Sequence, residues 1–323
     1  MNHDRPSHDR SRVVRVALLP VAASLLVAAI GQLDLARVLA ELGTVRPAWI
    51  LAALLCYAAI LPLWALQWRL LAPAPRPGFR RMFGVIVMTS SVLNTAPMLL
   101  GEAAGIALLV ARTGLSRAAA LSVLAMDQLL VGLAKTAVLA AAAAMLALPV
   151  WMWRGMTALG VGVALLLIAL GWLAWHGERL HASRLQRYSV RLAHAVSAAS
   201  VALAPLRSPA RGGGALGLAL AKKLVEVLAI LCVQRAFGLA LPFSSGVLVL
   251  ATLNLATLLP IVPGSVGVYE AAVLVAYRHL GVSAELALGI AVVQHACYFV
   301  ALALPGYRWL TRAALSRSAI AAS

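Results

Sequence analysis

The sequence predicts an all-α polytopic membrane protein with about six full spans and two inverted re-entrant helical hairpins. Apolar residues make up 63% of the 323 residues and charged residues only 11%, whereas a soluble domain is about half apolar and a quarter charged. Apolar runs of about 20 residues, long enough to cross a bilayer, recur along the chain. Two further apolar regions are interrupted near the middle by helix-breaking residues.

The predicted elements form one membrane domain at 14–308, because no shift in composition marks a separate soluble domain. A basic N-terminus (1–13) precedes it, and a basic tail (309–323) follows it. No small-residue cleavage site follows the first apolar run, so we expect that span to be retained. The full spans are predicted at 14–31, 48–71, 118–148, 155–175, 213–235 and 283–306. The interrupted regions are 83–112 and 243–280.

Arginine supplies most of the net charge of +17. The arginines gather in the N-terminus, in loop 69–81, in loop 177–211 and in the C-terminal tail. Positive loops face the cytoplasm in inner or plasma membranes, so we expect both termini to be cytoplasmic. This distribution also explains the charge without a nucleic-acid partner, and we expect none.

Loop 177–211 predicts an amphipathic helix on the cytoplasmic surface. Leu185, Tyr188, Leu192 and Val196 recur on one helical face, and arginines occupy another. Such a helix suits an anionic leaflet, either as an anchor or as a lipid sensor.

The two interruptions predict the tips of the hairpins. Prolines lack a backbone N–H, and glycines permit turns, so both break helices. Irregular backbone at membrane depth must be buried in protein or line a wet cavity. The first tip lies in NTAPMLLGE and carries Asn94, Pro97 and Gly101. The second lies in LPIVPGSVGVYE, and its tip residues are Pro260, Pro263, Gly264, Ser265 and Gly267.

An internal repeat connects the two regions. The segment from Glu102 aligns with the segment from Glu270 when one residue is skipped. The alignment then pairs Gly114 with Gly281, Ser116 with Ser283, and Asp127–Gln128 with Gln294–His295. Inverted repeats with paired broken helices are typical of transporters, and the breaks mark the substrate site.

Polar residues inside the apolar segments are the candidate substrate or transport residues, since ionisable groups in spans are costly. Glu270 and Glu102 are interpreted either as helix caps or as groups that handle a proton or a cationic head group. Glu226 has the spacing to pair with either neighbouring lysine. The lysines then form either a neutralised network or a cationic pocket for a lipid phosphate, and His295 is either a packing residue or a proton relay. The full candidate set is Glu102, Arg112, Asp127, Lys222, Lys223, Glu226, Glu270, Gln294 and His295.

Catalytic and metal-binding motifs are not found. The three cysteines are scattered through apolar segments and fit neither a disulfide framework nor a metal site. No nucleophile elbow, phosphate loop or zinc-binding helix motif occurs. We therefore expect no catalytic residue, no metal and no cofactor.

The two interruptions resemble the motifs of a known family. Pro263–Glu270 is similar to the P-G-G-x-G-x-x-E signature of flippase-like integral membrane proteins related to the N-terminal transmembrane domain of lysylphosphatidylglycerol synthase. Leu99–Glu102, followed by Leu108, Arg112 and Gly114, resembles that family's G-E-x-x-R-x-x-L-L-x-R-x-G-x-S block. The stretch Gln67–Leu71 before a basic loop also fits. The resemblance covers roughly residues 14–310.

This chain departs from the family pattern at three places. Ser265 replaces a glycine, Ala103–Ile106 contains no arginine, and Asp127–Gln128 stands where the family often has Glu-Arg. If the missing arginine holds an anionic head group in relatives, Lys222 or Lys223 takes its place here or the substrate differs. No aminoacyl-transferase domain follows residue 310, so the resemblance does not imply synthesis of a lysyl-lipid.

The resemblance implies movement of a phospholipid or polyprenyl-type lipid between leaflets. The expected partner is a membrane lipid with an anionic or phosphate-bearing head group, and a homodimer stays open. Two other functions remain at this point: a membrane-embedded transferase acting on a lipid-linked substrate, and a non-catalytic subunit of an envelope assembly.

Overall fold

The computed structural model describes residues 35–96, 98–180, 209–258 and 263–309. The predicted span 14–31, the basic N-terminus and nearly all of the basic tail lie outside these residues, and so does most of loop 177–211. Two predicted tip residues, Pro97 and Pro260, also lie outside them. Within the described residues all regular structure is helical, which confirms an all-α membrane protein.

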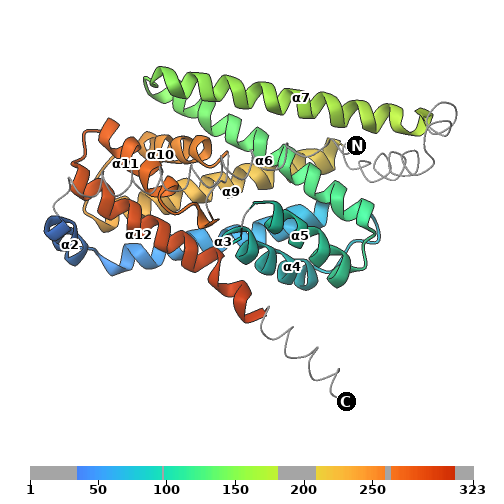
Figure 1. The fold of residues 1–323 in the computed structure, drawn as a ribbon, viewed down its shortest axis with the longest axis horizontal. Coiled ribbons are helices and arrows are strands. Elements are labelled where there is room, and N and C mark those ends of the chain that lie inside the picture. Colours follow the sequence, from blue (N-terminus) through green and yellow to red (C-terminus); the bar gives the residue numbers. More distant parts are fainter. Residues whose placement is uncertain (1–34, 97, 181–208, 259–262, 310–323) are drawn as a thin grey trace, which may run out of the picture.

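The helices are arranged as one elongated bundle (Figure 1). In chain order they are α2 (Leu35–Gly43), α3 (Pro47–Leu71), α4 (Phe79–Leu93), α5 (Met98–Thr113), α6 (Arg117–Met145), α7 (Val150–Leu180), α9 (Pro209–Ala236), α10 (Phe243–Ala256), the short 3₁₀ turn Pro263–Ser265, α11 (Val268–His279) and α12 (Ala284–Leu302).

Among the described residues, four helical stretches are long and apolar enough to cross a membrane: Pro47–Leu71, Arg117–Met145, Val150–Ala169 and Ala284–Trp309. They confirm the spans predicted at 48–71, 118–148, 155–175 and 283–306. Helix α9 covers the predicted span 213–235 and has 28 residues, or about 42 Å of helix. It carries two lysines and a glutamate in its middle, so composition sets it apart from the other four.

The two interrupted regions fold as pairs of short helices. The first hairpin consists of α4 and α5, with 15 and 16 residues. The second hairpin consists of α10 and α11, with 14 and 12 residues. At 1.5 Å per residue, each helix is about 18–24 Å long, shorter than the hydrocarbon core of about 30 Å. The predicted breaks are thus present. The first hairpin extends slightly beyond its predicted limits, to Phe79 and Thr113.

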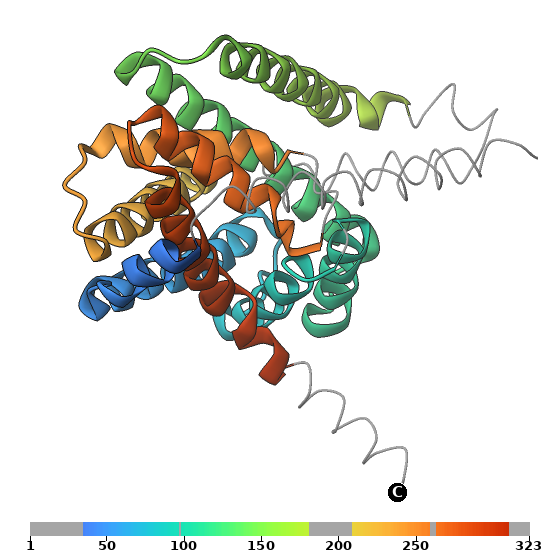
Figure 2. The same ribbon diagram turned by 60° about the vertical axis from the view of Figure 1, so that its left-hand side comes forward.

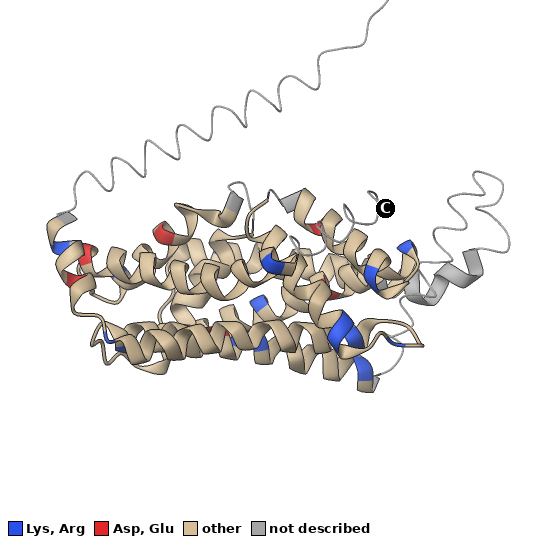
Figure 3. Cartoon of the chain, turned by 90° about the horizontal axis from the view of Figure 1, so that it is seen from below, with Lys and Arg blue, Asp and Glu red and all other residues tan. Residues whose placement is uncertain are grey.

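The interior is built around α3, which packs most extensively against α9 and also contacts α4, α6 and α12. Helix α7 lies along one side of the bundle in both ribbon views (Figure 2) and contacts α6 and α10. Large apolar side chains such as Leu55, Leu165 and Ile168 are more than half exposed. Figure 3 shows long uncharged stretches of ribbon between groups of charged residues, so the outer surface suits hydrocarbon better than water.

The aligned sequence segments have the same local structure. Gly114, between α5 and α6, has φ +75°, and Gly281, between α11 and α12, has φ +80°. Ser116 accepts a hydrogen bond from Ala119 N at 3.2 Å, and Ser283 accepts one from Leu286 N at 3.4 Å. Each serine therefore caps the long helix that follows its hairpin.

Candidate functional site

The ends of the two hairpins approach each other at Asn94 and Gly264. Asn94 ends α4, and Gly264 lies in the turn that precedes α11. A Cβ atom placed on Gly264 would lie 3.2 Å from the carbonyl oxygen of Asn94, and Gly264 has φ +66°. Both the close approach and the left-handed backbone favour glycine at this position. Gly101 plays a similar part in the first hairpin, where a Cβ would lie 2.6 Å from Leu93 Cδ2.

A cavity of about 200 Å³ borders both tips. Asn94, Gly264 and Ser265 line it from the tips. Its other polar walls come from α6, α9, α10 and α12, and they carry Lys135, Lys223, Glu226, Asn254 and His295. A cavity with polar walls between apolar helices is the environment that a polar group needs at membrane depth.

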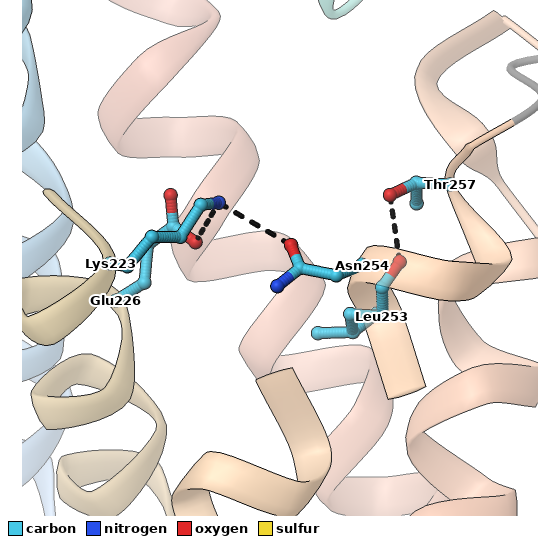
Figure 4. A network of polar contacts seen from close by, with 5 residues as sticks. All are labelled: Lys223, Glu226, Leu253, Asn254 and Thr257. Carbon is cyan, nitrogen blue, oxygen red and sulfur yellow. Dashed lines mark hydrogen bonds and ion pairs between the residues drawn. The ribbon is translucent and has the colours of Figure 1, made fainter. Parts of the chain in front are cut away.

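Lys223, Glu226 and Asn254 form the polar network of this cavity (Figure 4). Lys223 Nζ lies 2.7 Å from Glu226 Oε2 and donates to Asn254 Oδ1 at 3.4 Å. Both charged side chains are less than one-fifth exposed. The pairing of Glu226 left open by sequence is thus with Lys223, one turn away on α9. Because Asn254 comes from α10, the network also ties α9 to the second hairpin.

A second cavity of about 170 Å³ adjoins the first and shares Asn94, Lys223, Glu226 and Tyr298 with it. Lys222 lines this second cavity, and its Nζ lies 3.8 Å from Asp127 Oδ1.

Trp64 completes the surroundings of this ion pair. Trp64 Nε1 donates to Asp127 Oδ2 at 3.1 Å, and its ring lies 5.3 Å from the Lys222 ammonium. The lysine is therefore neutralised by a carboxylate and faces an aromatic ring, an arrangement that lowers the cost of burying its charge. Lys135 lies about two turns after Asp127 in α6 and lines the first cavity.

Glu270 makes two contacts, one at the start of its own helix and one with α12. Its Oε2 accepts from Gly267 N at 2.6 Å, which caps the start of α11. Its Oε1 lies 2.6 Å from His295 Nδ1 on α12. The His295 ring stacks on Tyr269 with centroids 4.2 Å apart, and Gln294 Nε2 donates to Tyr269 Oη at 2.8 Å. Gln294 and His295 thus hold the start of α11 against α12.

Two candidate residues lie apart from this centre. Glu102 is half-buried and accepts a hydrogen bond from Nε2 of the exposed Gln128 at 3.2 Å. Arg112 lies in a groove near the end of α5. Neither residue lines the two adjoining cavities.

The aromatic and amide side chains that line the cavities were not predicted from the sequence. Tyr57, Tyr269 and Tyr298 line the first cavity, and Asn254 completes its network. Tyr57 and Trp64 lie seven residues apart in α3, two helical turns on the same face. That spacing was the available signal, but aromatic residues at helical spacing are also common in apolar cores.

Comparison with known protein families identifies the family of this chain. A family model described as the lysylphosphatidylglycerol synthase TM region matches residues 12–306. No curated protein matches the chain. The family match spans both hairpins, all the described helices up to the end of α12, and the resemblance seen in the two glycine–glutamate motifs. The chain belongs to the lysylphosphatidylglycerol synthase transmembrane-region family.

Proposed function

We propose that this protein is a flippase-like transporter that moves a phospholipid or polyprenyl-type lipid between the leaflets of the inner membrane. The observation that carries the proposal is the pair of adjoining polar cavities at the hairpin tips. Family membership supports it, because the family links the chain to lipid metabolism or transport in a membrane.

The cavities offer a lipid head group a path that avoids hydrocarbon. Carrying a charge through the bilayer core costs several kcal/mol, about 2.5–3.5 kcal/mol even on insertion scales. Lys135 and Lys223 give the first cavity a cationic wall, which suits an anionic or phosphate-bearing head group. Glu226 forms an ion pair with Lys223, so an entering phosphate would compete with this carboxylate for the ammonium. The lipid tails would stay in the bilayer.

Re-entrant topology is part of the proposal. Helices of about 18–24 Å are shorter than the hydrocarbon core, and two of them joined by a turn can enter and leave on the same side. The aligned pairs Glu102–Gln128 and Glu270–His295 contact each other in each half, which supports a repeated unit. With the basic loops on the cytoplasmic side, the two units have opposite orientations, and both termini face the cytoplasm.

The test is lipid exchange in vesicles that contain the purified protein. Head-group-labelled phospholipid is exposed to a membrane-impermeant quencher, and exchange appears as loss of the protected inner-leaflet signal. We expect Lys135→Gln to slow exchange at least tenfold. The double variant Lys223→Gln/Glu226→Gln removes both charges together and avoids leaving one unpaired, and it should have a similar effect.

The matched control is Arg154→Gln/Arg211→Gln, which removes exposed charges away from the cavities and should leave exchange unchanged. Wild-type rates in both cavity variants would refute the role given to the cavities. No exchange by the wild-type protein with any common lipid would favour an envelope-assembly subunit, and turnover of a lipid-linked donor would favour a transferase.

A further inference from the structure

A cationic groove lies outside the two central cavities, at the end of the first hairpin where α4 begins and α5 ends. Its volume is about 620 Å³. Arg80 and Arg81 come from the first turn of α4, Arg112 comes from the last turn of α5, and Met88 and Trp309 supply apolar wall. Chain segments far apart in the sequence thus bring three arginines to one hollow.

The charge of this groove is not neutralised within the described residues. All three arginines are exposed, none has a hydrogen bond or ion pair with the described part of the chain, and no carboxylate lines the groove. Gly78 precedes α4 and provides no side-chain cap, so the positive end of that helix adds to the field. Guanidinium groups bind phosphate with paired N–H donors, which makes a phosphate the fitting ligand.

An apolar trough continues from the cationic groove. It has a volume of about 520 Å³, and Val300, Leu304, Pro305 and Arg308 line it together with Trp309. Trp309 is therefore a wall of both hollows. Its ring packs against the backbone of α4, because a Cβ on Gly84 would lie 2.9 Å from Trp309 Cζ3. Val300 and Leu304 are 45% and 47% exposed, so the trough is open to an acyl chain.

We propose that this groove binds an anionic phospholipid, with the phosphate between the three arginines and an acyl chain along Val300 and Leu304. A free anion would use the arginines but leave the trough empty, whereas a lipid matches both hollows and the tryptophan between them. Tryptophan is also enriched where head groups meet hydrocarbon. This inference does not rest on the proposed function, since the groove would hold a lipid even if the central cavities move none.

The test is ligand-dependent thermal stabilisation of the purified full chain in neutral detergent. The three ligands are short-chain phosphatidylglycerol, phosphatidylcholine with the same chains, and inorganic phosphate. We expect phosphatidylglycerol to raise the unfolding temperature at the lowest concentration. The variant Arg80→Gln/Arg81→Gln/Arg112→Gln should raise the half-maximal phosphatidylglycerol concentration at least tenfold.

Three further variants make the result specific. Arg154→Gln/Arg211→Gln/Arg235→Gln removes the same number of exposed arginines elsewhere and should leave the half-maximal concentration unchanged. Leu304→Asn should weaken the response to phosphatidylglycerol but not the response to inorganic phosphate. Leu165→Asn, at another exposed leucine, should keep the wild-type response to both ligands, which separates loss of the apolar trough from a general effect of an added polar side chain.

Several outcomes would overturn the lipid site. Equal responses in the groove variant and the arginine control would show that the cluster is not a site. Equal stabilisation by phosphatidylcholine would show that the anionic head group is irrelevant. Stabilisation by inorganic phosphate at the same concentration as phosphatidylglycerol, unaffected by Leu304→Asn, would reduce the groove to a site for free anions.

Discussion

The two hairpins share one plan but place their glutamates differently. Each consists of two short helices, and each is followed by a left-handed glycine and a serine-capped long helix. Glu270 is about 16% exposed and contacts both its own helix and His295. Glu102 is also half-buried, and within the described residues its side chain bonds to Gln128 on α6 alone. The two glutamates are aligned in the sequence repeat, but they have different hydrogen-bond partners in the structure.

The difference begins with where each helix starts. Helix α11 starts at Val268, so Glu270 is its third residue and can reach back to the N–H of Gly267. Helix α5 starts at Met98, so Glu102 is its fifth residue, one turn in, where a cap is no longer in reach. Because α5 starts two residues earlier relative to its glutamate, Glu102 does not cap its own helix and instead bonds to a side chain of α6.

The same asymmetry appears at the next pair of aligned residues. Asp127 forms a buried ion pair with Lys222, whereas its counterpart Gln294 forms a neutral hydrogen bond with Tyr269. Breaking one partner of a buried ion pair costs about 3–5 kcal/mol. Losing a neutral buried hydrogen bond costs about 1–3 kcal/mol. The largest loss of stability is thus expected for a substitution at Asp127, in the first half of the repeat.

We predict that Asp127→Asn lowers the unfolding free energy by about 3–5 kcal/mol, because Lys222 keeps a buried charge without its partner. Gln294→Leu should cost less. The measurement is reversible unfolding in mixed micelles containing a denaturing detergent. Adding Lys222→Met to Asp127→Asn removes the orphaned charge and should restore most of the stability. An Asp127→Asn cost no larger than that of Gln294→Leu would contradict a stabilising ion pair.

The glutamates are expected to give the next largest difference. Glu270→Ala removes a cap worth about 1 kcal/mol and a charge-assisted hydrogen bond worth about 1.5–3 kcal/mol. Glu102→Ala removes a single hydrogen bond to the exposed Gln128 side chain and should change stability by about 0.5 kcal/mol or less. The same unfolding assay compares them. In vesicles, lipid exchange should fall further with Glu270→Gln than with Glu102→Gln, and wild-type exchange in both would remove the carboxylates from the mechanism.

The sequence predicted those features that depend on local pattern. Run length located the four long apolar spans, and proline and glycine located both breaks. Spacing along one helix limited the partner of Glu226 to Lys222 or Lys223, and the structure pairs it with Lys223. Contacts such as Asp127–Lys222 and Lys223–Asn254 could not be predicted, because they depend on how α6, α9 and α10 pack. Asn254 and Tyr57 looked like ordinary residues of apolar helices until the packing placed them on a cavity wall.

The smallest predicted change in stability concerns two glycines at which the two halves of the repeat have the same backbone conformation. Gly114 and Gly281 both have positive φ, and a Cβ on either would meet no atom within 4 Å. Alanine at each position should therefore cost only the left-handed backbone penalty of about 1 kcal/mol, with no steric clash. We expect Gly114→Ala and Gly281→Ala to lower the unfolding free energy by equal amounts, and asparagine, which tolerates this conformation, to cost less at both. Unequal costs would mean that the two turns differ in the folded state, so that the two halves are similar in sequence but not in local structure.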